Sequence, residues 1–100
     1  MTHIRQQLKE GITFDARGWL AIGIYYAKIN QEAQAIEAFL QSVSLNPNEV
    51  DAWFNLGSLY EAEKNWPSAR MAYKKLLDLH DASYFQRDFA SKHLMIIGNR

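Results

Sequence analysis

Residues 53–60, Trp-Phe-Asn-Leu-Gly-Ser-Leu-Tyr, decide the fold, because they repeat the pattern of residues 19–26, Trp-Leu-Ala-Ile-Gly-Ile-Tyr-Tyr, at a 34-residue offset. A unit of this length cannot bury its apolar face alone, so such units stack into a solenoid. Because solenoids mostly bind other proteins, we expect the function to lie on a surface and not in a catalytic pocket. The 34-residue offset is called here one repeat period. The positions that match at this offset are Trp19 with Trp53, Ile22 with Leu56, Gly23 with Gly57, Tyr26 with Tyr60, Ala35 with Ala69, and Phe39 with Tyr73.

The composition is that of one folded domain over residues 1–100, with 48% hydrophobic and 13% aromatic residues. Eleven basic residues balance eleven acidic ones, so no positive field favours nucleic acid as a partner. Cysteine is absent, which excludes disulfides, thiolate catalysis and cysteine-based zinc sites and favours a cytoplasmic location. The polar start and the lack of a long apolar run predict neither a signal peptide nor membrane insertion.

Apolar residues recur at steps of three and four along five segments, which predicts five helices. Asn30 and Gly98 are suited to end a helix, and Asn48 and Ser83 are suited to cap the start of one. The predicted helices span residues 16–29, 32–45, 50–63, 66–79 and 84–97, and a thinner pattern predicts a short lead-in helix over residues 3–10.

Small residues at matching positions explain how the helices of each unit pack. Gly23 and Gly57 on the first helices, with Ala35 and Ala69 on the second, remove side-chain bulk where two antiparallel helices cross. The neighbouring Trp and Tyr rings fill the wider space beside each crossing, and each buries on the order of 150–250 Å². The glycines therefore have a packing role that needs no ligand.

The set Trp53, Leu56, Gly57, Tyr60, Ala69 and Tyr73 on a 34-residue period resembles the tetratricopeptide repeat (TPR). The resemblance implies an all-α fold, a TPR-type right-handed superhelix of antiparallel helix pairs, that is, an α-α solenoid. Its parts would be a lead-in over residues 1–14, repeat one over residues 16–49, repeat two over residues 50–82 and a C-terminal capping helix over residues 83–98. A pentatricopeptide array, which would imply RNA, has a 35-residue period and lacks this Trp-Gly-Tyr set.

In proteins similar to this chain, the first helix of each repeat lines a concave groove, which is the usual peptide site. Carried over residue by residue, the groove face comprises Arg17, Leu20, Ala21, Ile24, Ala27 and Lys28 in repeat one, Asp51, Phe54, Asn55, Ser58, Glu61 and Ala62 in repeat two, and Phe85, Asp88, Phe89 and Lys92 in the last helix. The residues expected to contact a partner are Arg17, Leu20, Ile24, Lys28, Asp51, Phe54, Asn55, Ser58, Phe89 and Lys92.

The chemistry of this groove favours an apolar anchor over a charged terminus. Some family members grip a C-terminal carboxylate with converging Lys, Arg and Asn side chains. Asn55 stands where such an Asn is found, but apolar residues stand where the cations would be required. What remains is an apolar strip of Leu20, Ile24, Phe54 and Phe89, suited to an apolar residue from a partner helix or extended segment. Two alternatives stay open: Leu20, Phe54 and Phe89 pack against each other or a neighbouring helix, and Asn55 is bonded to water.

No catalytic, metal or cofactor site is predicted. His3, His80 and His93 show no spacing of three or four residues that would place two imidazoles on one helix face. No Ser-His-Asp order, phosphate loop or pocketed carboxylate pair is legible. The basic cluster over residues 70–75 suits either a solvated helix face or contact with an acidic partner or membrane surface.

The last predicted helix carries apolar residues around much of its circumference, where a solvent-facing cap should be polar on one side. These residues are Tyr84, Phe85, Phe89, Leu94, Met95, Ile96 and Ile97. Two functions follow from the sequence. The first is a non-enzymatic adaptor or scaffold that captures a protein or peptide segment in the groove. The alternative is a structural module that forms homo-oligomers through the apolar C-terminal helix.

Overall fold

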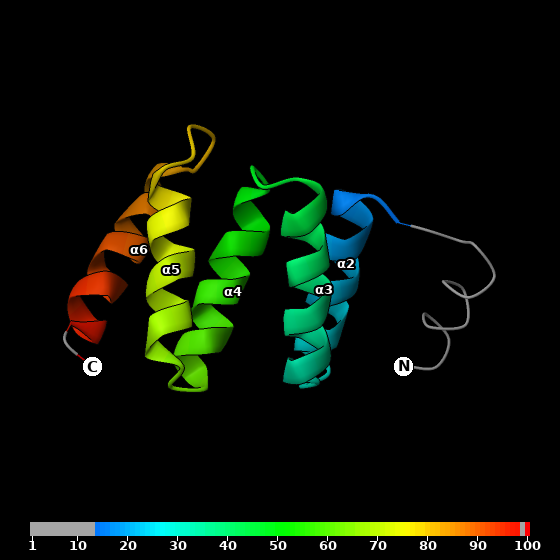
Figure 1. Ribbon diagram of the computed structural model, residues 1–100, viewed down its shortest axis with the longest axis horizontal. Coiled ribbons are helices and arrows are strands. Elements are labelled where there is room, and N and C mark those ends of the chain that lie inside the picture. The colour runs from blue at the N-terminus through cyan, green and yellow to red at the C-terminus, as the bar shows by residue number, and fades with distance from the viewer. Residues whose placement is uncertain (1–13, 99) are drawn as a thin grey trace.

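The computed structural model describes residues 14–98 and 100, and within them every regular element is a helix. The helices are arranged along the longest axis of the molecule (Figure 1). They are α2 (Ala16–Lys28), α3 (Glu32–Leu45), α4 (Val50–Ala62), α5 (Trp66–Leu77) and α6 (Tyr84–Ile97). Helix α2 packs on α3 and α4 on α5 as antiparallel pairs, while α3–α4 and α5–α6 contacts join the pairs. The predicted all-α stack of helix pairs is confirmed, the handedness of its superhelix stays a prediction, and the predicted helix over residues 3–10 lies outside the described residues.

Side-chain caps begin three of these helices. The Asp15 carboxylate caps α2 by accepting a hydrogen bond from the backbone N–H of Gly18 at 2.8 Å. Asn65 caps α5 in the same way. Ser83 begins α6 as predicted and forms a capping box, in which the Gln86 side chain accepts a hydrogen bond from the Ser83 backbone N–H at 2.9 Å.

Four predicted boundaries are wrong by one or two residues. Helix α2 ends at Lys28 and not Ile29, and α4 ends at Ala62 and not Glu63. The N-cap of α4 is Glu49 and not Asn48, because the Asn46 side chain accepts the Asn48 N–H at 3.1 Å and holds it in the preceding turn. Helix α5 ends at Leu77, before the predicted Leu79. The Leu79 N–H bonds to the carbonyl three residues earlier, which is turn geometry and not α-helical geometry.

The turn inside each unit has the same geometry. Asn30 and Lys64, which are one repeat period apart, both have a φ of 61°, in the left-handed region that ends helices. In both turns the next residue donates its N–H to the carbonyl five residues back, from Gln31 to Tyr26 and from Asn65 to Tyr60, each at 2.9 Å. The sequence repeat is therefore a repeat of backbone geometry.

Each unit is locked where a glycine on its first helix meets a ring on its second. A Cβ atom added to Gly23 would lie 2.5 Å from Cε1 of Phe39, and one added to Gly57 would lie 2.5 Å from Cε1 of Tyr73. Both rings are fully buried. The glycines therefore serve the predicted helix crossing, and any larger residue would displace a core ring.

Helix α6 repeats the register of the first helices α2 and α4. The N-caps of the three helices, Asp15, Glu49 and Ser83, follow one another at one repeat period. Gly98 ends α6 with a φ of 53°. It follows Lys64 by one repeat period, as Lys64 follows Asn30. Helix α6 therefore stands where the first helix of a further unit would stand.

Arg87 holds α6 in place at the position that tryptophan occupies in the two repeats. The Trp53 indole N–H donates to the Pro47 carbonyl at 2.7 Å and ties α4 to the turn before it. Arg87 follows Trp53 by one repeat period and ties α6 to the preceding turn by the same means. Its guanidinium donates to carbonyl oxygens at the end of α5 and in the turn, those of Leu77, Leu79 and Ala82.

One side of α6 is buried and the opposite side is exposed. Ala90 and Ile97 are fully buried, so Ile97 does not belong to the exposed apolar surface predicted for this helix. Tyr84 and Met95 are 86% and 81% exposed. Their face of α6 corresponds in register to the face of α4 that the following helices cover.

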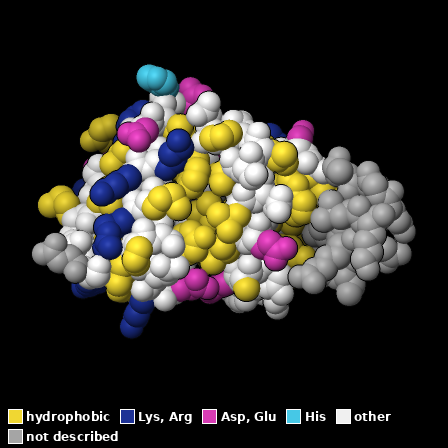
Figure 2. Space-filling view, viewed as in Figure 1, with side chains coloured by type: hydrophobic (Ala, Val, Ile, Leu, Met, Phe, Trp, Pro, Cys, Tyr) yellow, Lys and Arg dark blue, Asp and Glu magenta, His cyan; other side chains and the backbone are white. Residues whose placement is uncertain are grey.

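The face toward the viewer in Figure 2 shows apolar side chains gathered between α3 and α5 and cationic side chains over α5 and α6. Leu40 on α3 and Met71 on α5 are exposed. Arg70 donates to the backbone carbonyl of Arg100 at 2.8 Å. Between residues 14 and 98, no helix has both the length and the apolar character that a membrane crossing requires.

Candidate functional site

Three phenylalanine rings of α4 and α6 meet on the predicted groove face. The Phe54 ring centroid lies 4.9 Å from that of Phe89 and 6.1 Å from that of Phe85. The Phe85 and Phe89 centroids are 6.1 Å apart. Phe85 is 65% exposed, while Phe54 and Phe89 are half-buried. These three residues, named here the phenylalanine cluster, offer an aromatic seat for an apolar side chain.

A hydrogen-bonded pair continues the cluster toward α5. The His93 ring stacks on Phe89 with centroids 3.9 Å apart and an angle of 14° between the planes. His93 Nδ1 lies 2.7 Å from Oε1 of Glu61, and the Tyr73 hydroxyl donates to the same oxygen at 2.8 Å. Glu61 on α4 therefore joins α5 and α6 at one point.

The protonation of Tyr73 fits this arrangement. The pKa of the Tyr73 hydroxyl is raised above its ordinary value of 10.0, with burial of its ring as the larger cause and the hydrogen bond to Glu61 as the smaller cause. Since the neutral hydroxyl is the form that donates, the contact between Tyr73 and Glu61 persists throughout the neutral pH range.

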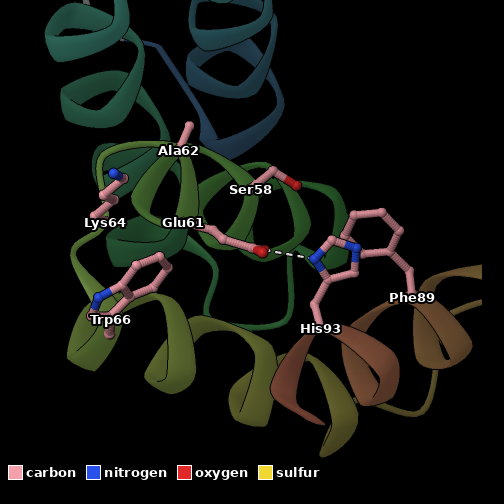
Figure 3. Close-up of a pocket in the computed structure, with 7 residues that line it drawn as sticks. All are labelled: Ser58, Glu61, Ala62, Lys64, Trp66, Phe89 and His93. Atoms are coloured by element: carbon pink, nitrogen blue, oxygen red, sulfur yellow. Dashed lines mark hydrogen bonds and ion pairs between the residues drawn. The ribbon is translucent and has the colours of Figure 1, made fainter. Parts of the chain in front are cut away.

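A pocket of about 370 Å³ opens beside the phenylalanine cluster, between α4, the start of α5, and α6 (Figure 3). The Glu61 carboxylate points toward His93, while the Lys64 ammonium points away from it. The lining residues are Ser58, Glu61, Ala62, Lys64, Trp66, Phe89 and His93.

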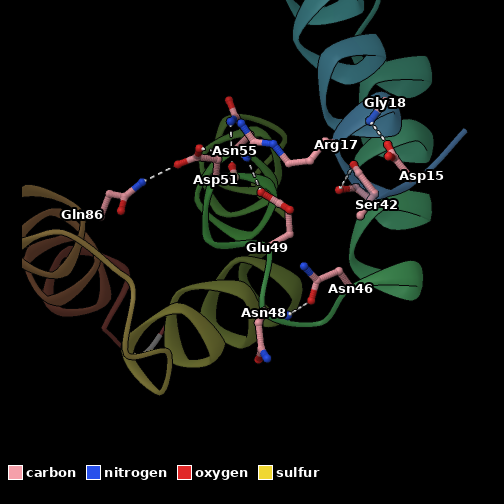
Figure 4. A network of polar contacts seen from close by, with 11 residues as sticks. Asp15, Arg17, Gly18, Ser42, Asn46, Asn48, Glu49, Asp51, Asn55 and Gln86 are labelled. Atoms are coloured by element: carbon pink, nitrogen blue, oxygen red, sulfur yellow. Dashed lines mark hydrogen bonds and ion pairs between the residues drawn. The ribbon is translucent and has the colours of Figure 1, made fainter.

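A polar network holds together the starts of α2, α4 and α6, the helices of the predicted groove (Figure 4). Nη1 of Arg17 on α2 lies 2.6 Å from Oε1 of Glu49, whose side chain is nearly buried, and 3.9 Å from Oδ2 of Asp51. The hydrogen bond and the charge of Glu49 raise the pKa of Arg17. Asp51 accepts from Gln86 Nε2 on α6 at 2.8 Å through its carboxylate and from Asn55 Nδ2 at 2.7 Å through its backbone carbonyl. The network fixes Arg17, Asp51 and Asn55 within the fold.

Leu20 does not lie on the groove surface, so that prediction is wrong. Its side chain is 3% exposed and belongs to the hydrophobic core. Leu20 precedes Phe54 by one repeat period, and Phe54 packs against the first helix that follows it. The alternative that Phe54 and Phe89 pack against each other is confirmed for this pair.

The other predicted contact residues are spread over α2, α4 and α6. Ile24 and Lys28 are exposed on α2, whereas the phenylalanine cluster belongs to α4 and α6. Lys92 Nζ lies 3.0 Å from Asp88 Oδ2 on the same helix. Ser58 lines the pocket beside the cluster. Whether these residues contact a partner stays a prediction.

Sequence reasoning missed His93 and Trp66, which line the pocket beside the phenylalanine cluster. Glu61 and His93 lie 32 residues apart on different helices, so no local spacing links them. One signal was available, because His93 follows Phe89 by four residues and the two rings must therefore share a helix face. In the part of the chain that the structure describes, no three His, Asp or Glu side chains converge as metal ligands would.

Comparison with known proteins gives two family models, both of the tetratricopeptide repeat. One matches residues 16–49 and the other residues 38–71. Together they cover α2, α3 and α4 and the first half of α5, including both turns that contain a left-handed residue.

The chain is similar to several known proteins. It is 35% identical over 75 residues to mouse (Mus musculus) Superkiller complex protein 3, which covers 69% of this chain and 5% of that protein. It is 36% identical over 62 residues to the Tetratricopeptide repeat domain-containing protein PYG7, chloroplastic, of Arabidopsis thaliana, covering 62% of this chain and 21% of that protein. It is 28% identical over 81 residues to Anaphase-promoting complex subunit cut9 of Schizosaccharomyces pombe, covering 81% and 12%. The chain thus spans a small part of each relative.

Proposed function

Because the chain belongs to the tetratricopeptide repeat family, we propose that it is a non-enzymatic adaptor that captures a peptide segment or a helix of a partner protein. The site is the groove face formed by α2, α4 and α6. The partner places an apolar side chain on the phenylalanine cluster and polar groups along Asp51, Asn55 and Ser58. A cytoplasmic location is part of this proposal and rests on the cysteine-free composition.

The single observation that carries the proposal is the exposure of Phe85. A phenylalanine that is 65% exposed, in contact with two further rings, leaves apolar surface in water. Burying such a ring against a partner is favourable by about 25 cal/mol per Å² of apolar surface. In repeats one and two the corresponding positions carry the charged residues Arg17 and Asp51. The groove is therefore apolar at its α6 side.

The names of two relatives support a role in assembly, since one is named as a protein of the Superkiller complex and the other as a subunit of the anaphase-promoting complex. Those names describe the relatives. For this chain they favour protein partners over small-molecule substrates.

The test is affinity capture from a cell lysate with the wild-type chain and the Phe85→Ala variant, followed by calorimetry with the purified partner. We expect Phe85→Ala to weaken binding by about tenfold or more, as for a central aromatic contact. Its melting temperature should change little, because most of the ring is already in water.

Tyr84→Ala is the matched control, because Tyr84 is the neighbouring aromatic residue on α6, is 86% exposed and lies outside the cluster. It should bind the partner as the wild type does. Equal loss of binding in both variants, or no loss in Phe85→Ala, would contradict capture by the groove.

A second candidate function is homo-oligomerisation through α6, favoured by the exposure of Tyr84 and Met95 on its outer face. Light scattering across a concentration series measures it. A Met95→Glu variant should then be monomeric while keeping its affinity for a groove partner. A wild-type chain that stays monomeric at every concentration would exclude this function.

A further inference from the structure

The pocket next to the phenylalanine cluster has the chemistry of a site for a cation. Glu61 supplies a carboxylate whose two contacts, with Tyr73 and His93, both use Oε1. Among the described residues, nothing donates a hydrogen bond to its Oε2. The Glu61 side chain is 21% exposed, and hydrogen bonds from charged donors to a carboxylate are stronger than those from neutral donors.

His93 adds a second acceptor. A carboxylate carries no hydrogen, so the short contact between His93 Nδ1 and Glu61 requires the proton to be on Nδ1. In the neutral ring, Nε2 is then an acceptor. Ser58 contributes a hydroxyl to the same pocket. The Glu61 carboxylate and the Ser58 hydroxyl therefore offer acceptor atoms, and a neutral His93 ring adds Nε2.

The walls of the pocket are aromatic. Phe89 stacks on His93 on the α6 side, and Trp66 lines the side formed by α5. The chain itself shows what the Trp66 ring attracts, because the guanidinium carbon of Arg100 lies 5.5 Å from its centroid. Planar guanidinium groups bind well to aromatic faces and to carboxylates.

We propose that the pocket receives an arginine side chain of the partner, next to the apolar residue that the phenylalanine cluster holds. The guanidinium bonds to Glu61 Oε2 and lies against the aromatic walls. This inference rests on the proposed groove function and names the chemistry of the partner segment, an apolar residue followed closely by an arginine. Lys64 is the cation in the pocket lining, and its ammonium points away from Glu61, which leaves the carboxylate accessible (Figure 3).

The experiment uses two short probes, acetyl-Phe-Arg-amide and acetyl-Phe-Leu-amide, titrated into the full chain. Nuclear magnetic resonance follows the Trp66 indole N–H and the His93 ring signals. We expect the arginine probe to bind about tenfold more tightly than the leucine probe, a difference typical of a charge-assisted contact. The arginine probe should shift the Trp66 and His93 signals, and the leucine probe should shift mainly phenylalanine signals.

Glu61→Gln is the decisive variant. Glutamine keeps an oxygen for the Tyr73 hydroxyl and His93 Nδ1 but carries no charge. The variant should bind the two probes alike, with its affinity for the leucine probe unchanged. Its melting temperature reports whether the fold is retained. If that variant unfolds, Lys64→Gln gives the independent readout, because removing a competing cation at an exposed position should tighten the arginine probe about twofold and leave the leucine probe unaffected.

The outcomes separate the two proposals. Equal affinity of the wild type for both probes, or a preference for arginine that survives Glu61→Gln in the folded variant, overturns the arginine pocket and leaves groove capture standing. A preference of equal size for an acetyl-Phe-Lys-amide probe overturns arginine as the specific side chain. If neither probe shifts any signal, the pocket is overturned, and partner capture by the wild type against Phe85→Ala decides the groove separately.

Discussion

Repeat one and repeat two have the same backbone frame but differ in the polar groups attached to it. In both, a glycine meets a buried ring, and a left-handed residue ends the first helix. In repeat one the ring is Phe39, and the residue that corresponds to Glu61 is Ala27. In repeat two the ring is Tyr73, and its hydroxyl is hydrogen-bonded to Glu61.

The comparison shows which positions set the fold and which are available for function. The glycine and ring cannot change independently, because a Cβ at either glycine would come within 2.5 Å of the ring. The hydroxyl of Tyr73 and the carboxylate of Glu61 are additions to this frame. They occur in the repeat that borders α6, where Glu61 also contacts His93. Repeat two therefore carries the chemistry of the candidate site.

The largest effect is expected from removing the rings. Phe39→Ala and Tyr73→Ala should each lower the free energy of unfolding by about 3–5 kcal/mol, because both rings are fully buried and would leave a cavity. Urea denaturation of each variant measures this. Similar losses would support an equal role of the two rings in their units, whereas a loss below about 1 kcal/mol in one variant would show that the units are not equivalent.

The glycines should respond next. Gly23→Ala and Gly57→Ala should each destabilise the protein by about 1–3 kcal/mol through overpacking against the ring. In the Tyr73→Ala background the sign should reverse for Gly57→Ala, with a gain of about 0.5–1 kcal/mol from helix propensity once the ring is absent. Double-mutant denaturation curves measure the coupling. Additive effects would mean that the ring is not what excludes a side chain at Gly57.

Removal of one hydroxyl tests the difference between the repeats. Tyr73→Phe makes repeat two resemble repeat one at this position and should lower the free energy of unfolding by about 0.5–1.5 kcal/mol, the net contribution of one hydrogen bond. Adding both partners to repeat one, as Phe39→Tyr with Ala27→Glu, should be less destabilising than Phe39→Tyr alone. Urea denaturation of the three variants checks the order.

The same hydroxyl predicts a dependence on alkaline pH. The folded state holds the Tyr73 proton more tightly than the unfolded state, because burial and Glu61 raise the pKa above 10.0. This contribution to stability is fully present below the unfolded pKa and is lost as the pH rises above it toward the folded value. Tyr73→Phe should therefore show a shallower loss of stability above about pH 10 than the wild type. Parallel curves for the two proteins would contradict this assignment.

The smallest effect is expected at the turns. Lys64 has a left-handed backbone that lysine adopts at a cost, whereas Asn30 tolerates the same conformation better. Lys64→Gly should therefore raise the free energy of unfolding by up to about 1 kcal/mol, and Asn30→Gly by less. Thermal and urea denaturation of both variants measure the difference. A larger gain at Asn30 would show that strain is not what distinguishes these turns.

The sequence was sufficient for the features that depend on local spacing. The helix bounds agree within two residues, and the glycine crossings follow from the repeat period, because each uses residues of one unit. Leu20 was misplaced because periodicity defines a helix face but not which neighbour covers it. Leu20 is buried in the core, and its burial follows from the packing of the helices and not from the spacing within one helix.

The candidate site was predicted only in outline. Phe54 and Phe89 were expected on one surface and do meet, because their helices occupy successive first-helix positions. The contacts of Glu61 with Tyr73 and His93 join three helices and depend on side-chain rotamers. Arg87 stands at the tryptophan position and still ties its helix to the turn before it. Arginine and tryptophan differ in residue type, so a sequence pattern would not predict that they share this role.

The equal spacing of the N-caps Asp15, Glu49 and Ser83 makes the chain a modular building block. Every first helix begins at the same count of residues after the one before it. A copied cassette of residues 50–83 spliced in before Tyr84 would meet α6 through the α5–α6 contact that already exists in the molecule. The contact between α5 and the copied α4 would be new. Protein engineers can therefore lengthen the array, and with it the length of partner segment that it reaches, by designing one new connection.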